Sequence, residues 1–142
     1  MFETAKSLVT AAQNIVIIQA ENPDGDSLGS ALALEEILGD MGKSVQIHCP
    51  SELPKYLHYI KGWDRVTPEF NTAADLMIIV DTTAEILLSK TLDIPGARTA
   101  LEKCDVLVLD HHISESTLSF DVELVSEQAV STSEVIYRMC EA

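Results

Sequence analysis

The chain has 142 residues, 46% of them hydrophobic, so it can bury the core of one domain and is not a disordered segment. Its 23 acidic and 9 basic residues give a net charge of −14, which argues against a basic surface for nucleic-acid phosphates, and we expect no binding to duplex DNA. With three scattered cysteines, no secretory signal and no apolar run long enough to span a bilayer, we expect a cytoplasmic protein without a disulfide framework or a membrane partner.

The first part of the chain alternates between helical and strand patterns. Helices are predicted where apolar residues recur three and four positions apart, and buried strands where an apolar run is short and continuous. In chain order, we predict a helix over 2–13, a strand over 15–18, a polar loop over 21–27, a helix over 28–41 and a strand over 45–47. Gly42 can end the second of these helices.

The rest of the chain continues the alternation. In order, we predict a short helix over 55–60, a strand over 76–80, a helical turn over 84–89, a helix over 97–103, a strand over 106–109 and a more exposed strand over 118–125. Ser131 and Glu134 have the S-x-x-E spacing of a capping box, which predicts a helix over 132–140. Strands that alternate with helices predict an α/β domain over 1–142, with a doubly wound, mostly parallel sheet flanked by helices on both faces.

Acidic residues and histidines follow three of the apolar runs. Asp24 and Asp26 come after the first run, Asp81 after the third, and Asp110-His111-His112 after the fourth. Because ligands of such sheets bind beyond the carboxyl ends of the strands, we expect these side chains to meet at one edge. Crowded carboxylates and imidazoles repel or change protonation unless a cation binds, and this ligand set suits Mn²⁺, Mg²⁺ or Fe²⁺. The sequence therefore predicts a divalent metal site.

Three motifs resemble those of the DHH phosphoesterases. Asn22–Ser30 (NPDGDSLGS) looks like their first motif, Val80-Asp81-Thr82 like the second, and Asp110–Ser114 (DHHIS) like the third, which names the family. Ala129–Glu134 (AVSTSE) is similar to the segment that follows in the nanoRNase and phosphoadenosine-phosphate phosphatase branch. The resemblance covers most of the chain. It implies that a metal-bound hydroxide hydrolyses a phosphodiester or phosphomonoester of a short oligonucleotide, a nucleotide or another phosphorylated small molecule.

The resemblance also implies a set of metal ligands. Asp24 would bind the first metal ion and Asp26 the second, while Asp81 would bridge both ions. His111 would bind the second ion. We therefore expect Mn²⁺ or Mg²⁺ as the cofactor, with two ions in a complete family site.

Two further residues of the third motif would serve the reaction without binding metal. By resemblance, Asp110 would orient His111, as carboxylates commonly do for ligating imidazoles. His112 would face the phosphate and donate a hydrogen bond or positive charge to it.

Two features depart from the family pattern. Ala20 stands where the first motif normally has a histidine. The family normally continues into a further aspartate and a second, substrate-holding domain, and we expect both to be absent from this chain. On these grounds we expect one well-held ion, at Asp26, Asp81 and His111, and poor turnover by the chain alone. The sequence is also compatible with a homodimer.

Other interpretations compete for the first acidic loop. Asp24 and Asp26 can simply cap the following helix. Asp24, Asp26, Gly29 and Glu35 match EF-hand positions, but Leu28 occupies a ligand position and a strand precedes the loop. A phosphatase of the haloacid-dehalogenase type would use Asp24 as its nucleophile, but it leaves the paired histidines unexplained. A truncated or degenerate domain that binds metal and phosphate without turnover remains an alternative.

Overall fold

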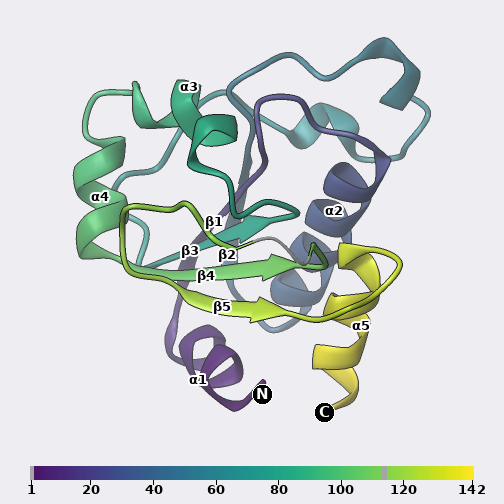
Figure 1. The fold of residues 1–142 in the computed structure, drawn as a ribbon. Helices are drawn as coiled ribbons and strands as arrows, with labels where there is room; N and C mark the ends of the chain where they lie inside the picture. Colours follow the sequence, from purple (N-terminus) through teal and green to yellow (C-terminus); the bar gives the residue numbers. More distant parts are fainter. Residues whose placement is uncertain (1, 113–114) are drawn as a thin grey trace.

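The computed structural model of the chain describes residues 2–112 and 115–142, so the last two residues of the DHHIS motif lie outside the described residues. A sheet of five parallel strands, in the order β2-β1-β3-β4-β5, forms the centre of the domain (Figure 1). The strands are β1 (Asn14–Ile18), β2 (Ser44–His48), β3 (Leu76–Val80), β4 (Asp105–Asp110) and β5 (Glu123–Ser126). The predicted α/β class with a parallel sheet is confirmed.

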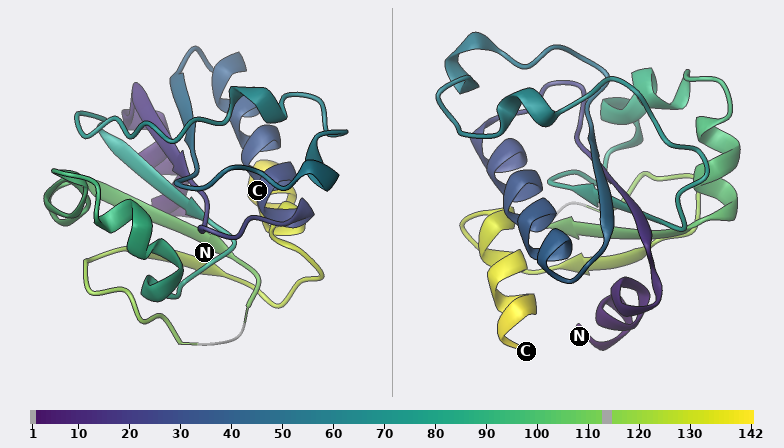
Figure 2. Two further views of the ribbon diagram at one scale, coloured as in Figure 1. Left: turned by 90° about the horizontal axis from the view of Figure 1, so that it is seen from above. Right: turned by 180° about the vertical axis from the view of Figure 1, so that it is seen from behind.

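Helices cover both faces of this sheet, as a doubly wound fold requires. One face packs against α1 (Glu3–Ala11), α2 (Gly25–Asp40) and α5 (Thr132–Glu141), and the other against α3 (Ser89–Leu92) and α4 (Ala97–Lys103). Short 3₁₀ helices occupy the connections: η1 (Lys55–Leu57), η2 (Trp63–Arg65) and η3 (Glu85–Leu88). Helices α2 and α5 lie side by side in both Figure 1 and Figure 2. No helix within the described ranges is long and apolar enough to cross a membrane.

The three central strands, β1, β3 and β4, are apolar at successive positions because both faces of the sheet are covered there. All five residues of β3 are buried, with Ile78 and Val80 facing the α2 side and Met77 and Ile79 facing the α4 side. Full burial of each such side chain contributes about 1.5–3 kcal/mol. The two cores therefore hold the sheet, and with it the strand ends that carry the polar motifs.

The start of helix α2 decides where the acidic residues of the first motif lie. Helix α2 begins at Gly25, earlier than the predicted position 28, because the Asp24 carboxylate accepts a 2.9 Å hydrogen bond from the backbone N–H of Ser27. Asp26 therefore lies in the first helical turn and not in a loop. The predicted end is confirmed: Gly42 follows α2 with a φ of 82°.

The capping residues predicted for the last helix are in place. Ser131 accepts a hydrogen bond of 3.2 Å from the backbone N–H of Glu134. In return the Glu134 carboxylate accepts from the N–H of Val130, one residue earlier than in an ideal capping box. Helix α5 therefore has a well-defined first turn.

The exposed strand predicted over 118–125 is only partly present, because regular pairing is confined to Glu123–Ser126. The preceding residues form a loop whose Phe120 is buried against the α4 side of the sheet. Hydrogen bonds to Thr83 and Glu85 hold this loop at Thr117 and Ser119. Packing on the neighbouring layer accounts for the alternating pattern there.

Candidate metal centre

Side chains from three separate segments meet at the carboxyl edge of the sheet. Nε2 of His111 lies 3.4 Å from Oδ2 of Asp26 and 3.4 Å from Oδ1 of Asp81. Asp26 comes from the first turn of α2, Asp81 directly follows β3, and His111 directly follows β4. The sequence predicted this meeting from the shared direction of parallel strands, and the structure places the three side chains together.

Asp81 also belongs to a wider cluster of potential ligands. Asp81, Asp110, His111 and His112 each offer one ligand atom, and these four atoms lie within 4.8 Å of one another. Asp81 has a φ of 67°, a backbone conformation that is uncommon outside glycine and costs on the order of 1 kcal/mol. Its N–H is held at 2.9 Å by the carbonyl of Leu109, so the end of β4 supports the strained turn. Strain of this kind is concentrated at functional sites.

The first turn of α5 surrounds the two carboxylates with hydrogen-bond donors. The N–H of Thr132 donates to Oδ2 of Asp26 at 3.0 Å, and its hydroxyl donates to Oδ1 of Asp81 at 2.9 Å. Oδ1 of Asp26 accepts from the N–H and hydroxyl of Ser133 and from the hydroxyl of Ser30, each at 3.3 Å. The sequence predicted this helix start but not its contact with the site. The available signals were the hydroxyl-rich S-T-S run at the cap and the resemblance of Ala129–Glu134 to a family segment.

Asp110 contacts a different imidazole from the one expected. The resemblance implies that Asp110 orients His111. In the structure its Oδ1 instead lies 2.5 Å from Nδ1 of His112 and accepts a 2.8 Å bond from the backbone N–H of His111. The ring of His112 therefore contacts this carboxylate, while the ring of His111 lies beside the carboxylates of Asp26 and Asp81.

The electrostatics of the carboxylates show that the site suits a cation. Burial raises the pKa of Asp26, but the hydrogen bonds led by the N–H of Thr132 outweigh it and hold the pKa below its usual value. Burial raises the pKa of Asp81 to about 7, with further increases from Asp26 and Asp24, although the Thr132 hydroxyl lowers it. A proton on Asp81 relieves the repulsion between the carboxylates, and a divalent cation would do the same.

Two more observations bear on whether the donor set fits a divalent ion. Within the described part of the chain, Oδ2 of Asp110 is buried and has no hydrogen-bond partner. Carboxylate oxygens and imidazole nitrogens are the donors preferred by Mn²⁺ and related ions. Burial lowers the pKa of His112, but the hydrogen bond and charge of Asp110 outweigh it and raise the pKa above its ordinary value.

The first acidic residue of the motif has a structural role. Asp24 caps α2 through its bond to Ser27, which is the capping alternative considered for this loop. Asp26, in contrast, caps nothing in its own helix and receives its hydrogen bonds from α5 and Ser30. The proximity of Asp24 to the site is felt through its charge, which contributes to the raised pKa of Asp81.

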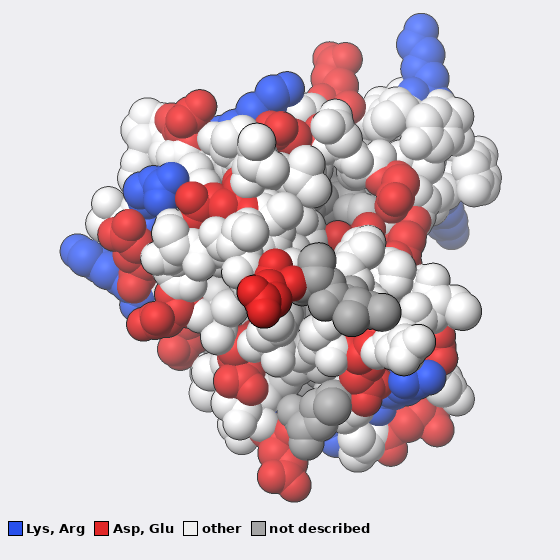
Figure 3. All heavy atoms as spheres, in the orientation of Figure 1, with Lys and Arg blue, Asp and Glu red and all other residues white. Residues whose placement is uncertain are grey.

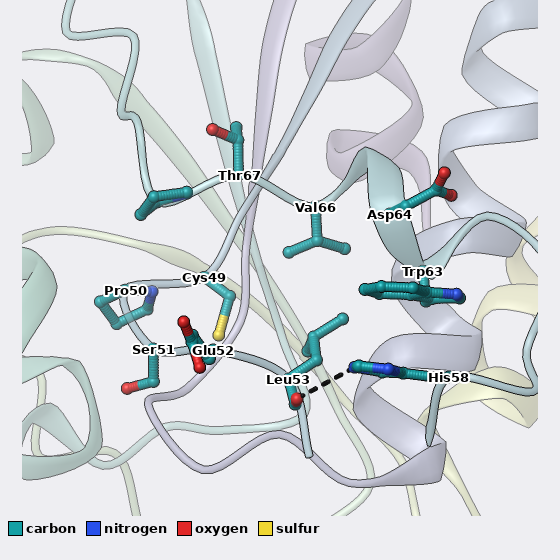
Figure 4. A pocket seen from close by; sticks show the side chains of 11 residues that line it. Cys49, Pro50, Ser51, Glu52, Leu53, His58, Trp63, Asp64, Val66 and Thr67 are labelled. Carbon is teal, nitrogen blue, oxygen red and sulfur yellow. Dashed lines mark hydrogen bonds between the residues drawn. The ribbon is translucent and has the colours of Figure 1, made fainter. Parts of the chain in front are cut away.

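A separate cavity of about 430 Å³ lies beyond the end of β2 (Figure 4). The rings of His58 and Trp63 stack at one side of it, 3.7 Å apart and 6° from parallel. Cys49 also lines the cavity, while its thiol donates to the carbonyl of Ala20 at 3.6 Å. None of the predicted site residues lines this cavity, so the cavity and the candidate metal centre are separate sites.

Comparison with known proteins identifies a family and a structurally similar protein. The profile of the "DHH family, N-terminal domain" matches residues 14–142. The solved structure of an exopolyphosphatase-related protein from Bacteroides fragilis aligns with 99% of this chain at a TM-score of 0.84 and 26% sequence identity. This chain covers 43% of that protein, less than half of its length.

Proposed function

Because the chain belongs to the DHH family, we propose that it is the metal-binding domain of a phosphoesterase acting on a short oligonucleotide, a nucleotide or another small phosphate ester. The observation that carries the proposal is the position of His111, whose Nε2 faces oxygens of Asp26 and Asp81 at equal distances of 3.4 Å. Two carboxylates and one imidazole from three separate segments have no need to converge in this way for folding alone.

We propose the following ligands for each metal ion. Asp26, Asp81 and His111 would hold the second Mn²⁺ or Mg²⁺ ion of a complete family site, and Asp24 and Asp81 would hold the first. Such ions supply positive charge that polarises a phosphate ester and lowers the pKa of bound water. Ala20 offers no ligand where the family motif has histidine, so we propose that the site around Asp26 is the tighter one.

His112 and Asp110 would act on the phosphate without holding metal. Asp110 is fully buried, whereas the side chain of His112 is 49% exposed and can meet a ligand from solvent. With its Nδ1 on Asp110, the imidazole of His112 keeps its proton to higher pH and can donate through Nε2 to a phosphate oxygen. Asp110 would thus orient the imidazole of His112 and favour its protonated form.

The surface charge favours a small substrate over a long nucleic acid. On the face in Figure 3, acidic side chains are widely spread and most Lys and Arg side chains lie near the periphery. The chain has no excess of cations to follow a phosphate backbone, since its net charge is −14. Local attraction for an anionic substrate therefore has to come from the metal centre and His112. The name of the Bacteroides fragilis relative adds polyphosphate to the substrates worth testing.

Calorimetric titration with Mn²⁺ tests the metal site directly. The wild-type chain should bind Mn²⁺, and Asp26→Asn should weaken binding strongly because it removes a ligand charge. Asp40→Asn is the matched control, since Asp40 is an exposed aspartate at the other end of the same helix, and it should bind as wild type does. No binding by the wild-type chain, or equal binding by both variants, contradicts the metal site.

Hydrolysis is tested on a panel with Mn²⁺: a dinucleotide RNA, phosphoadenosine phosphate, a chromogenic phosphodiester, pyrophosphate and a short polyphosphate. Product release from at least one substrate should disappear in Asp81→Ala, while Asp40→Asn should keep it. Release from none of them at high protein concentration, with Mn²⁺ binding intact, would instead support the binding domain without turnover.

A further inference from the structure

One threonine of α5 contacts both carboxylates of the metal centre. The N–H of Thr132 donates to Oδ2 of Asp26, and the hydroxyl of the same residue donates to Oδ1 of Asp81. These are the same two oxygen atoms that lie 3.4 Å from Nε2 of His111. Thr132 and His111 therefore share both oxygens, and together they bring two acids from different elements to one point.

The start of α5 explains why Thr132 can serve in this way. It is the first residue of the helix, so its N–H has no partner within the helix and is free to donate. Ser131 caps the same turn, and the positive end of the helix dipole favours nearby carboxylates. Thr132 is fully buried, and Val135 and Ile136 in the following turn anchor α5 in the core.

The hydroxyl of Thr132 has a task that no neighbouring donor shares. Ser30 and Ser133 contact Asp26 and, through their hydroxyls, each other, and loss of either hydroxyl leaves Asp26 with its bond from the N–H of Thr132. Among the hydrogen bonds of the described residues, Asp81 receives its side-chain bond from Thr132 alone. When both carboxylates are ionised they repel each other, and the Thr132 hydroxyl is the hydrogen-bond donor that holds Asp81 in place against this repulsion.

We propose that the Thr132 hydroxyl is the positioning group that keeps the carboxylate of Asp81 beside that of Asp26, so that a divalent cation meets both ligands already in place. The inference rests on the proposed metal site and adds a residue outside its ligand set. Such supporting hydrogen bonds typically change metal affinity by about 10–100-fold when removed. Thr132 is thus a positioning residue that acts through Asp81.

Three variants separate the hydroxyl from the shape of the side chain. Thr132→Val removes the bond to Asp81 and keeps both the volume and the backbone bond to Asp26, whereas Thr132→Ser restores the hydroxyl. Thr91→Val is the matched control: Thr91 is also fully buried, and its hydroxyl lies 2.9 Å from Nε2 of His48 on the other side of the sheet. Thr132→Ala repeats the loss of the hydroxyl should the valine variant fail to fold.

The measurement is Mn²⁺ affinity by calorimetry, with urea unfolding in EDTA to compare the metal-free stability of each variant. Thr132→Val and Thr132→Ala should bind Mn²⁺ about tenfold or more weakly, while Thr132→Ser and Thr91→Val should bind close to wild type. Wild-type affinity in Thr132→Val overturns the inference and leaves the metal site standing. Equal weakening in Thr132→Ser and Thr132→Val overturns it too, since shape would then matter more than the hydroxyl. Absence of Mn²⁺ binding by the wild-type chain removes both proposals.

Discussion

Oδ1 of Asp110 lies 2.5 Å from Nδ1 of His112, so the buried acid that ends β4 holds the second imidazole of the motif. The bond connects a fully buried carboxylate to a half-exposed ring. It gives the outer imidazole a fixed orientation and a source of negative charge behind it. The two histidines therefore have different surroundings. His111 lies beside the carboxylates of Asp26 and Asp81, whereas His112 contacts that of Asp110.

Asp110→Asn should lower the pKa of His112. In the wild-type protein that pKa is above the ordinary 6.5, because the bond and charge of Asp110 outweigh burial. A raised histidine pKa favours the folded state at low pH, and this benefit is lost as the pH rises through the folded value. NMR titration of the His112 ring protons in metal-free protein, assigned with His112→Gln, measures the change. Asp105→Asn, at the exposed start of β4, should leave the midpoint in place, and an unchanged midpoint in Asp110→Asn would disprove the coupling.

Asp81→Asn should stabilise the metal-free protein at alkaline pH. The folded pKa of Asp81 is about 7 against an ordinary 3.8, so the folded state retains a proton that the unfolded chain has lost. Stability from this group is present at low pH and is lost as the pH rises through that window. The neutral amide avoids the loss, and we expect a gain on the order of 1–2 kcal/mol at pH ~8. Urea unfolding in EDTA at pH ~5 and ~8 measures it.

The gain in Asp81→Asn should shrink at the lower pH, where wild-type Asp81 is protonated. Saturating Mn²⁺ should reverse the order, because the ion stabilises only a protein that binds it. A stability difference that is the same at both pH values would show that Asp81 is not held in a raised-pKa state.

His48 should make the folded state less stable at acidic pH, whereas Asp81 makes it less stable at alkaline pH. Its ring is fully buried, with Nδ1 2.9 Å from the Glu69 carbonyl and Nε2 2.9 Å from the Thr91 hydroxyl. Burial lowers its pKa, although the bond to Glu69 opposes this. The unfolded chain therefore takes up a proton first, and stability falls as the pH drops below the ordinary histidine value of 6.5.

His48→Gln should be less stable than wild type at pH ~7 but should lose less stability on acidification to pH ~5.5, since it has no imidazole to charge. Urea midpoints at the two pH values provide the comparison. Parallel losses in both proteins would mean that His48 does not contribute to the acid sensitivity.

Ser131→Ala should destabilise the protein by about 1 kcal/mol, the usual effect of removing an N-cap acceptor. The side chain of Ser131 accepts the N–H of Glu134 in the first turn of α5. Ser131→Asp keeps an acceptor and should restore most of the stability. Urea unfolding measures both variants. The same turn donates a hydrogen bond to Asp26, so loss of the cap in Ser131→Ala should also lower Mn²⁺ affinity. Unchanged stability in Ser131→Ala would show that the fold does not need the cap.

Several parts of the fold follow from local patterns that act over a few residues. The apolar run at 76–80 predicted β3 with its observed bounds, and 97–103 predicted α4 in the same way. The start of α2 was placed too late, because the capping bond from Ser27 to Asp24 draws polar residues into the helix. The strand over 118–125 was too long, because Phe120 packs on the opposite layer and the pairing begins only at Glu123.

The sequence by itself determined the class of fold and the edge at which Asp26, Asp81 and His111 meet, because parallel strands bring residues at their carboxyl ends to one side. Tertiary structure alone decided that Asp110 contacts the ring of His112 and that Thr132 joins the carboxylates of Asp26 and Asp81. Those contacts depend on the orientation of the side chains that follow β4 and on the docking of α5 beside α2. The Thr132 contacts join segments more than 50 residues apart in the chain, and the Asp110 contact depends on side-chain orientation after β4, so no local pattern of residue types encodes either.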